Sequence, residues 1–399
     1  MVATGTVVLS YLGFVFPSSV GTWSVVTQGV AITAFIVLSA VIAMQRLRLT
    51  QTIVNVVFVL YALAITVVVV AGVVHLPGHP AATDPTNWSA YLPSSPTGVN
   101  LGNWTFFGLV ILALLGVEVP LNMGVEIRES RAVTRYLLWG SAAVVVAYLA
   151  VTWAIMVTVP AQDGQSASVV AVAQAAAIGL GSGWGEAVAL VLAAFFLFIT
   201  VVYNYSFARL VFVSGLDRAL PATMAQVTRH RVPANAIWAQ TVVAASFTAL
   251  AFVVLPLVGI GGGRPVDVQT RVYDVLQAAV TVIWCLSMVV LFVDVLIILR
   301  RYPEQFRATR LAHPIVFWIC SVLGSLAAAI GVLSTLSGSW TPLITNDAGT
   351  VRVAGATVHY GTWFWAVAGI AAGSLAVGVL LYLLGRRAHR PSPEVPPLS

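Results

Sequence analysis

Charged side chains are scarce in this chain, since they make up only 8% of its 399 residues. A soluble domain carries about 25% charged residues, so the composition excludes an ordinary soluble protein and indicates an integral membrane protein. Cysteine occurs only at Cys285 and Cys320, both inside apolar runs, which excludes a disulfide framework or a cysteine zinc site. The six histidines are scattered along the chain, so we expect no metal centre and no cofactor.

Long apolar runs dominate the sequence instead. A membrane-spanning helix needs about 20 apolar residues, and nine runs approach or exceed that length. They lie near residues 24–45, 52–75, 104–125, 136–159, 187–213, 234–257, 273–299, 314–337 and 362–384, and a shorter apolar piece covers residues 2–16. These runs are longer than the strands of a membrane barrel. We therefore predict an all-α integral membrane protein with nine full spans and one partial span.

All nineteen basic residues are arginine, and their distribution predicts the orientation. Only Arg264, Arg271 and Arg352 fall on one side of the predicted spans, and the other sixteen arginines fall on the opposite side. The positive-inside rule makes that opposite side cytoplasmic. We expect a multi-pass protein of the cell (inner or plasma) membrane, with a membrane domain over residues 1–384 and a cytoplasmic tail over 385–399. The net charge of +6 is then no argument for binding nucleic acid.

One predicted span contains residues that an ordinary membrane helix avoids. The stretch 111–131, ILALLGVEVPLNMGVEIRESR, places Gly116, Glu118 and Pro120 within apolar sequence. A buried carboxylate costs at least ~2–3 kcal/mol unless it faces protein or water, and Pro120 removes a backbone donor. Broken helices are tolerated where they line a cavity, which favours a binding site for a polar solute. The alternative is a kinked, packed helix in which Glu118 hydrogen-bonds to a neighbour.

Two glycine-rich stretches, GLGSGWG at 179–185 and GIGGGR at 259–264, fall between predicted spans. We expect both to lie in external loops. Neither follows a strand within a βαβ unit, so a phosphate-binding role is not predicted.

Two motifs resemble a known family. Gly116-Val117-Glu118, the downstream Glu126 and the Arg128–Arg135 cluster resemble the sixth helix and following loop of amino acid–polyamine–organocation permeases. The stretch RLVFVSGLDRALPATMAQVTRHRVPANAIW at 209–238 resembles the family's end of helix 8, the following loop and the entry into helix 9. The pattern is most similar to the bacterial arginine/agmatine and glutamate/GABA antiporters. The resemblance covers nearly the whole chain.

This resemblance implies a fold of two five-helix inverted repeats followed by two extra helices, with a binding site at the membrane midplane. By the family's pattern, the piece ending at Pro17 resembles the second half of helix 3. Helices 1 and 2 and the first half of helix 3 are then absent, and the missing helix 1 normally supplies half of the site. We therefore expect an N-terminally truncated chain, with further coding sequence upstream.

The resemblance also implies site residues. On helix 6 these are Leu112, Leu115, Gly116, Val117 and Glu118, with Glu118 sensing pH or substrate charge. Tyr203 on helix 8 falls where the resembling antiporters carry an aromatic that closes over the substrate, although a packed structural tyrosine fits the sequence equally well. Helix 10 carries Trp284. Asn204 and Ser206 follow Tyr203 and are expected to bond across helices.

Three functions remain open. The first is secondary transport of an amino acid or related amine across the membrane, by exchange or coupled to protons. The second is a non-transporting remnant or regulatory membrane protein, favoured by the absent helices. The third, a membrane-embedded enzyme, has the least support because Glu118 and Asp294, the two acids recognised deep in the predicted spans, lie on different helices. The expected partners are a small amino acid or amine and the lipid bilayer. Both a monomer and a homodimer fit the resemblance.

Overall fold

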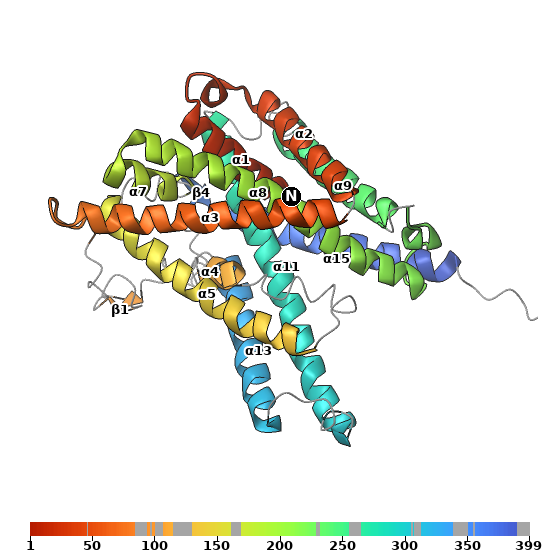
Figure 1. The fold of residues 1–399 in the computed structure, drawn as a ribbon. Coiled ribbons are helices and arrows are strands. Elements are labelled where there is room, and N and C mark those ends of the chain that lie inside the picture. The colour runs from red at the N-terminus through yellow and green to blue at the C-terminus, as the bar shows by residue number, and fades with distance from the viewer. Residues whose placement is uncertain are drawn as a thin grey trace, which may run out of the picture. The chain divides into compact units, whose positions relative to one another are not determined.

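A computed structural model describes the chain at residues 1–45, 47–83, 94–95, 98–99, 107–114, 130–160, 169–228, 232–254, 265–304, 306, 313–337, 350–353 and 356–388. The described chain is almost entirely helical (Figure 1). Its α-helices are α1 (Val2–Val15), α2 (Val25–Ala43), α3 (Leu47–His75), α4 (Phe107–Leu114), α5 (Ser130–Thr158), α7 (Ala171–Leu180), α8 (Ser182–Leu216), α9 (Ala234–Ala249), α11 (Pro265–Arg301), α13 (Pro314–Ser337) and α15 (Tyr360–Ala388).

Short elements connect or extend these helices. They are the 3₁₀ turns η1 (Val20–Thr22) and η5 (Ala222–Ala225), the π-helical turn η6 (Leu250–Val254), and the strands β1 (Ser94–Ser95), β2 (Gly98–Val99), β3 (Thr350–Val353) and β4 (Ala356–His359). The strands form two antiparallel hairpins, β1 with β2 and β3 with β4.

The all-α membrane fold predicted from the sequence is confirmed. Eight of the described helices are long and apolar enough to cross a membrane, namely α2, α3, α5, α8, α9 with η6, α11, α13 and α15. They correspond to eight of the nine predicted spans. The ninth, at 104–125, is described only over α4, and the rest of it lies outside the described residues. The apolar piece at 2–16 forms the short helix α1.

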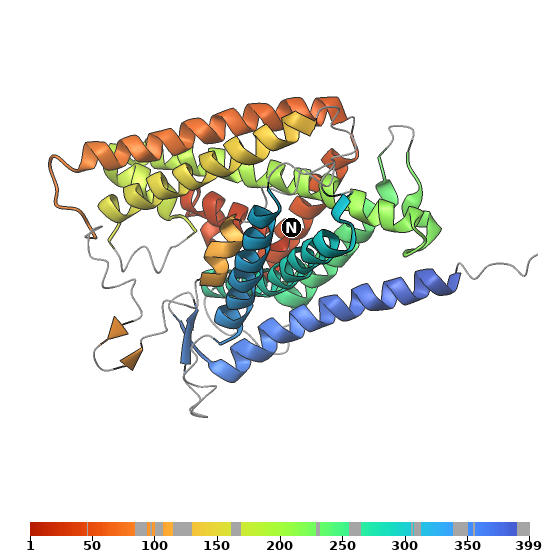
Figure 2. The same ribbon diagram turned by 90° about the horizontal axis from the view of Figure 1, so that it is seen from below.

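The chain forms two compact units. Unit 1 comprises residues 1–85, 117–273 and 376–399, and unit 2 comprises residues 86–116 and 274–375. In unit 1 the long helix α8 packs against α1, α2, α3, α7 and α9, while α5 lies beside α3 (Figure 2). Two apolar clusters hold these helices together. One surrounds Val68, Ala154 and Leu192, and the other surrounds Ala40, Val201 and Ile237.

Unit 2 has its own apolar core. Ala279 and Val282 of α11 pack with Trp363 and Val367 of α15, and α13 contributes partly buried side chains to the same cluster. The indole N–H of Trp363 donates to the Thr335 carbonyl oxygen at 3.2 Å. Burying an indole usually requires such a partner, so this bond fixes α15 against α13.

The glycine-rich stretch 179–185 is not a loop, contrary to the prediction. Helix α7 ends at Leu180, α8 begins at Ser182, and Gly181 alone separates them. Gly181 has φ +103°, a conformation that residues with a Cβ rarely adopt. A single glycine therefore reverses the chain. The second stretch, 259–264, lies outside the described residues.

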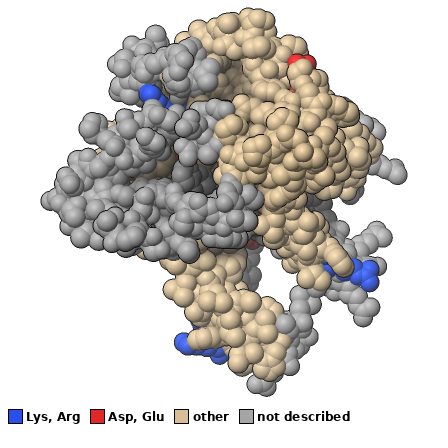
Figure 3. Space-filling model, turned by 90° about the vertical axis from the view of Figure 1, so that its left-hand side faces the viewer, with Lys and Arg blue, Asp and Glu red and all other residues tan. Residues whose placement is uncertain are grey.

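The described surface is strongly apolar. Charged atoms form only small patches on the face drawn in Figure 3. On α5, Trp139 is 71% exposed and Leu149 is 68% exposed. In soluble proteins, large exposed apolar surfaces mark contacts with membranes or with other proteins. Here the exposed apolar side chains lie on candidate membrane spans, so they form the surface that lipid covers.

Candidate functional site

The buried face of α8 carries polar side chains in a helix that is otherwise apolar. Thr200, Asn204 and Ser206 are each 0% exposed. Thr200 and Asn204 are four residues apart and so lie on the same face of the helix. In hydrocarbon a buried polar group needs a partner, so this face identifies where α8 meets other helices through hydrogen bonds.

Thr200 joins α8 to α1. Its hydroxyl oxygen lies 2.8 Å from that of Thr4 and 2.7 Å from the Phe196 carbonyl oxygen. The Thr4 hydroxyl in turn donates to the Met1 carbonyl oxygen at 2.7 Å. The contact therefore links two helices that are far apart in the sequence.

Asn204 joins α8 to α2. Its amide nitrogen donates to the Ser39 hydroxyl at 2.9 Å, and that hydroxyl donates to the Ile36 carbonyl oxygen at 2.8 Å. The prediction that Asn204 bonds across helices is thus confirmed. The Asn204 side-chain oxygen is buried and accepts no hydrogen bond from the residues that the structure describes. One half of this amide therefore carries an uncompensated desolvation cost.

Gln269 joins the start of α11 to α1. Its side-chain amide donates to the Thr6 carbonyl oxygen at 2.7 Å and to the Ser10 hydroxyl at 2.9 Å. Helix α1 is thus bonded by side chains to both α8 and α11. These bonds restrict sliding of α1, because apolar packing alone lacks their directionality.

Tyr203 lies on α8 directly before Asn204 and is half-buried. Its ring centroid is 5.7 Å from that of Phe207, with the rings tilted by 44°. Further along α8, the Arg209 guanidinium donates to the Tyr205 hydroxyl at 2.8 Å and lies 5.2 Å from the centre of the Tyr205 ring. Tyr203 directly precedes Asn204, so it lies where the hydrogen bond to Ser39 holds α8 against α2.

Leu112 and Trp284 belong to unit 2, on α4 and α11, and both are half-buried. Leu112 follows Gly108 by one helical turn. A Cβ at Gly108 would collide with the Thr335 hydroxyl and would lie 2.9 Å from the Gly331 carbonyl oxygen and 3.2 Å from Thr281. Glycine is therefore required where α4 meets α13 and α11. This contact brings the helices of Leu112 and Trp284 together, whereas Tyr203 lies in unit 1.

A comparison of the whole sequence with known families decides the class. The sequence profile of the amino acid permease family matches residues 1–372. The chain belongs to this family. No curated protein matches the chain. Members of this family are transporters rather than enzymes, and the permease is accordingly a multi-pass membrane transporter of amino acids.

Four of the predicted site residues of the permease, Leu115, Gly116, Val117 and Glu118, lie outside the described residues. The broken helix predicted for this stretch therefore stays a prediction. Within the described part of the chain, no group of three His, Cys, Asp or Glu side chains could hold a metal ion.

Sequence reasoning missed several polar residues of the permease. The span predicted from residue 273 belongs to a helix that begins at Pro265. Gln269 and Arg271 therefore lie in this helix rather than in a loop, and Asp274 lies in its third turn rather than at its start. Asp274 is half-buried and was not recognised as a deep acid. Their polarity lowered the local hydropathy and moved the predicted boundary. An amphipathic pattern over 265–277 was the available signal.

Proposed function

We propose that this permease carries an amino acid or a related amine across the cytoplasmic membrane by alternating access, through exchange or proton coupling. The single observation that carries the proposal is the family match over residues 1–372, which includes all three segments that carry the proposed site residues. Under this proposal the helices form two five-helix inverted repeats with two further helices, and the substrate binds where the repeats meet.

The substrate class proposed is that of the arginine/agmatine or glutamate/GABA antiporters. Tyr203 supports a substrate with an ammonium or guanidinium group, because an aromatic face attracts such cations. Its half-buried position and the Asn204 bond beside it suit a ring that must keep one orientation. Leu112, Leu115, Gly116, Val117 and Trp284 are proposed as further substrate contacts.

Exchange in proteoliposomes tests this proposal. Vesicles loaded with arginine, agmatine, glutamate or GABA should take up the matching labelled solute if transport is by exchange, and unloaded vesicles should do so only under an imposed proton gradient if transport is proton-coupled. Tyr203→Leu should reduce uptake of a cationic substrate by roughly 5- to 30-fold, consistent with a lost cation–π contact of ~1–2 kcal/mol, while Tyr203→Phe retains most of the uptake. Tyr382→Leu, at an exposed tyrosine of α15, is the matched control. Uptake unchanged in Tyr203→Leu would remove this residue from the site.

Glu118 is proposed to change protonation during transport. The variant Glu118→Gln keeps the size and the hydrogen-bonding capacity but removes the charge. Exchange by this variant should lose or shift its pH dependence, while its detergent stability stays near that of the parent protein. If Glu118 is only a structural hydrogen-bonding group, the Gln variant will be silent and Glu118→Ala will mainly reduce expression.

The proposed orientation places the C-terminus in the cytoplasm. Single cysteines at Ser89 and Ser339 should react with an impermeant reagent added to intact cells, and cysteines at Ser130 and Ala308 should be protected. The background for these variants carries Cys285→Ser and Cys320→Ser. Reversed labelling would overturn the arginine-based orientation.

A further inference from the structure

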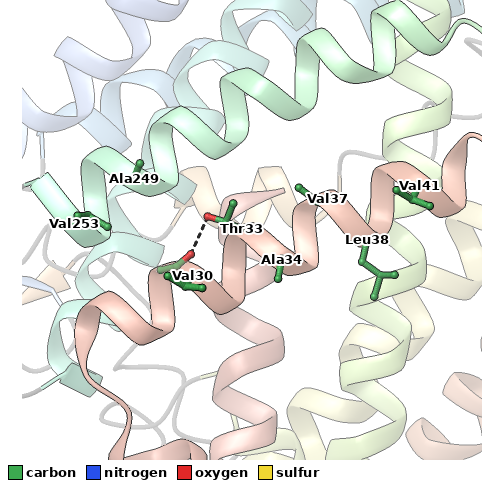
Figure 4. Close-up of a pocket in the computed structure, with 9 residues that line it drawn as sticks. Val30, Thr33, Ala34, Val37, Leu38, Val41, Ala249 and Val253 are labelled. Carbon is green, nitrogen blue, oxygen red and sulfur yellow. Dashed lines mark hydrogen bonds between the residues drawn. The ribbon is translucent and has the colours of Figure 1, made fainter.

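An apolar groove of about 680 Å³ runs between α2 and the end of α9 in unit 1 (Figure 4). Among the described residues that line this groove, only Thr33 has a polar side chain. Its hydroxyl donates to the Gly29 carbonyl oxygen at 2.9 Å. An amino acid carries two charges, and a charge that leaves water needs a charged or polar partner. The side chains that recognise an amino acid therefore lie elsewhere in the chain.

A line of polar and aromatic side chains follows one face of α11. Its members succeed one another at intervals of three or four residues, and they are Arg271, Asp274, Gln277, Thr281 and Trp284. This spacing places them on the same face of the helix. All five belong to one continuous helix, so helix geometry alone sets their separations. Trp284, the last of them, is already a proposed substrate contact.

The first two members of this line lie inside a candidate membrane span. The stretch Val268–Arg301 is long and apolar enough to cross a membrane. Asp274 follows Val268 by six residues, which is roughly 9 Å along a helix. Gln269, just before Arg271, donates to the Thr6 carbonyl oxygen and to the Ser10 hydroxyl of α1. This end of α11 is therefore packed against another helix.

Arg271 and Asp274 are both half-buried and carry opposite charges. Residues three apart on a helix can pair, yet neither side chain makes a hydrogen bond or an ion pair with the residues that the structure describes. The Arg271 Nε atom is itself buried. Ionisable side chains within membrane spans usually face the helix bundle or a water-filled cavity and mark the path of a solute. An unpaired guanidinium and an unpaired carboxylate one turn apart thus suit a ligand with both charges.

We propose that Arg271 and Asp274 bind the α-carboxylate and the α-ammonium group of a zwitterionic amino acid, respectively. The planar guanidinium of arginine can donate two parallel hydrogen bonds to a carboxylate, and the Asp274 carboxylate accepts hydrogen bonds from the ammonium group. This inference rests on the proposed transport function and adds the charge pattern of the substrate to it. In the proposed orientation, this end of α11 is its outer end, so the pair is an early contact for a solute that enters from outside.

Ligand binding to the purified full-length chain in detergent tests the pair separately from transport. Isothermal titration calorimetry would compare arginine with agmatine, which lacks the α-carboxylate, and with 5-guanidinopentanoate, which lacks the α-amino group. Glutamate, GABA and glutarate form the equivalent series. In the series that the protein binds, we expect the amino acid to bind roughly 10- to 100-fold more tightly than either analogue, the scale of a hydrogen bond to a charged group.

Variants of the two residues should each remove one preference. Arg271→Gln should abolish the preference over the analogue that lacks the α-carboxylate, and Arg271→Lys should retain part of it. Asp274→Asn should abolish the preference over the analogue that lacks the α-amino group. Arg300→Gln and Asp294→Asn make the same changes at exposed positions further along α11. These matched controls should keep both preferences.

Each other outcome would contradict the proposal or the transport function. Unchanged preferences in Arg271→Gln and Asp274→Asn would show that the pair does not hold the substrate, and a lowered thermal stability with unchanged preferences would show that its role is structural. Absence of binding for all six solutes would also overturn the site. A parent protein that binds an amino acid in this way but does not transport it in proteoliposomes would overturn the proposed function and not the site.

Discussion

Two helix faces in unit 1 use the same membrane environment in opposite ways. The buried face of α8 presents Thr200 and Asn204, which bond to other helices. The face of α2 along the groove presents Val30, Leu38 and Val41, which are 62%, 49% and 40% exposed. Lipid tails are as apolar as leucine, so apolar surface alone gives little preference for helix over lipid. Polar pairs therefore define where helices must meet, and smooth apolar surfaces define where lipid can lie.

Ser39 and Gly29 show that one helix can carry both kinds of contact. Ser39 faces α8 and accepts the Asn204 hydrogen bond, while Gly29 faces the π-helical turn after α9. The first contact depends on a matched donor and acceptor, and the second depends only on shape. The two should respond to different substitutions, which makes the comparison testable.

The largest effect is expected when charge enters the polar face. Asn204→Asp places a carboxylate in a fully buried position within a membrane span, at a cost of ~2.5–3.5 kcal/mol. We expect a large loss of folded protein and a lowered free energy of unfolding in a detergent titration. Asn235→Asp is the same change at an exposed amide in the first turn of α9. It removes the hydrogen bond to the Thr223 carbonyl oxygen and should therefore cost no more than ~1.5 kcal/mol. Equal losses of stability in the two variants would contradict the assignment of Asn204 to a buried contact between helices.

An intermediate effect is expected when volume enters the shape-dependent contact. Gly29→Ala pushes a Cβ against Phe252, and overpacking of this kind costs ~1–3 kcal/mol. Gly13→Ala on α1 is the control, because a Cβ there meets no atom within 4 Å. Thermal unfolding should separate the two variants. A Gly29→Ala protein as stable as the Gly13→Ala protein would show that the helices can separate there without cost.

The smallest effect is expected for the Thr4–Thr200 pair. A double-mutant cycle with Thr4→Val and Thr200→Val should give a coupling energy of ~0.6 kcal/mol, the average for hydrogen bonds between membrane helices. Thr248→Val offers a control, since its buried hydroxyl donates within α9, to the Ala244 carbonyl oxygen at 2.9 Å. A coupling near zero would mean that the Thr4 and Thr200 hydroxyls are satisfied equally well by their own helices.

Most of the fold could be predicted because apolar run length is a local property of the sequence. Eight spans were located in this way, and errors arose where local composition was misleading. Because of the polar residues at the start of α11, its start was predicted at residue 273 rather than at Pro265. The glycines at 179–185 indicated a loop, whereas Gly181 alone turns the chain. Asn204 could be predicted to bond, but its partner could not, because Ser39 is 165 residues away and only packing brings it close. The proposed contacts at 115–118 lie outside the described residues.

The bonds made by α1 have a consequence for biosynthesis. Its partners Thr200 and Gln269 follow their α1 contacts by 196 and 263 residues. At 5–20 residues per second, the ribosome needs roughly 10–40 s to reach Thr200 after Thr4 and longer to reach Gln269. During that interval α1 is in or near the membrane with Thr4, Thr6 and Ser10 unmatched by their final partners. These three hydroxyls already donate to carbonyl oxygens of α1 and of its N-cap residue, so the helix can wait for its later partners without an unsatisfied hydroxyl.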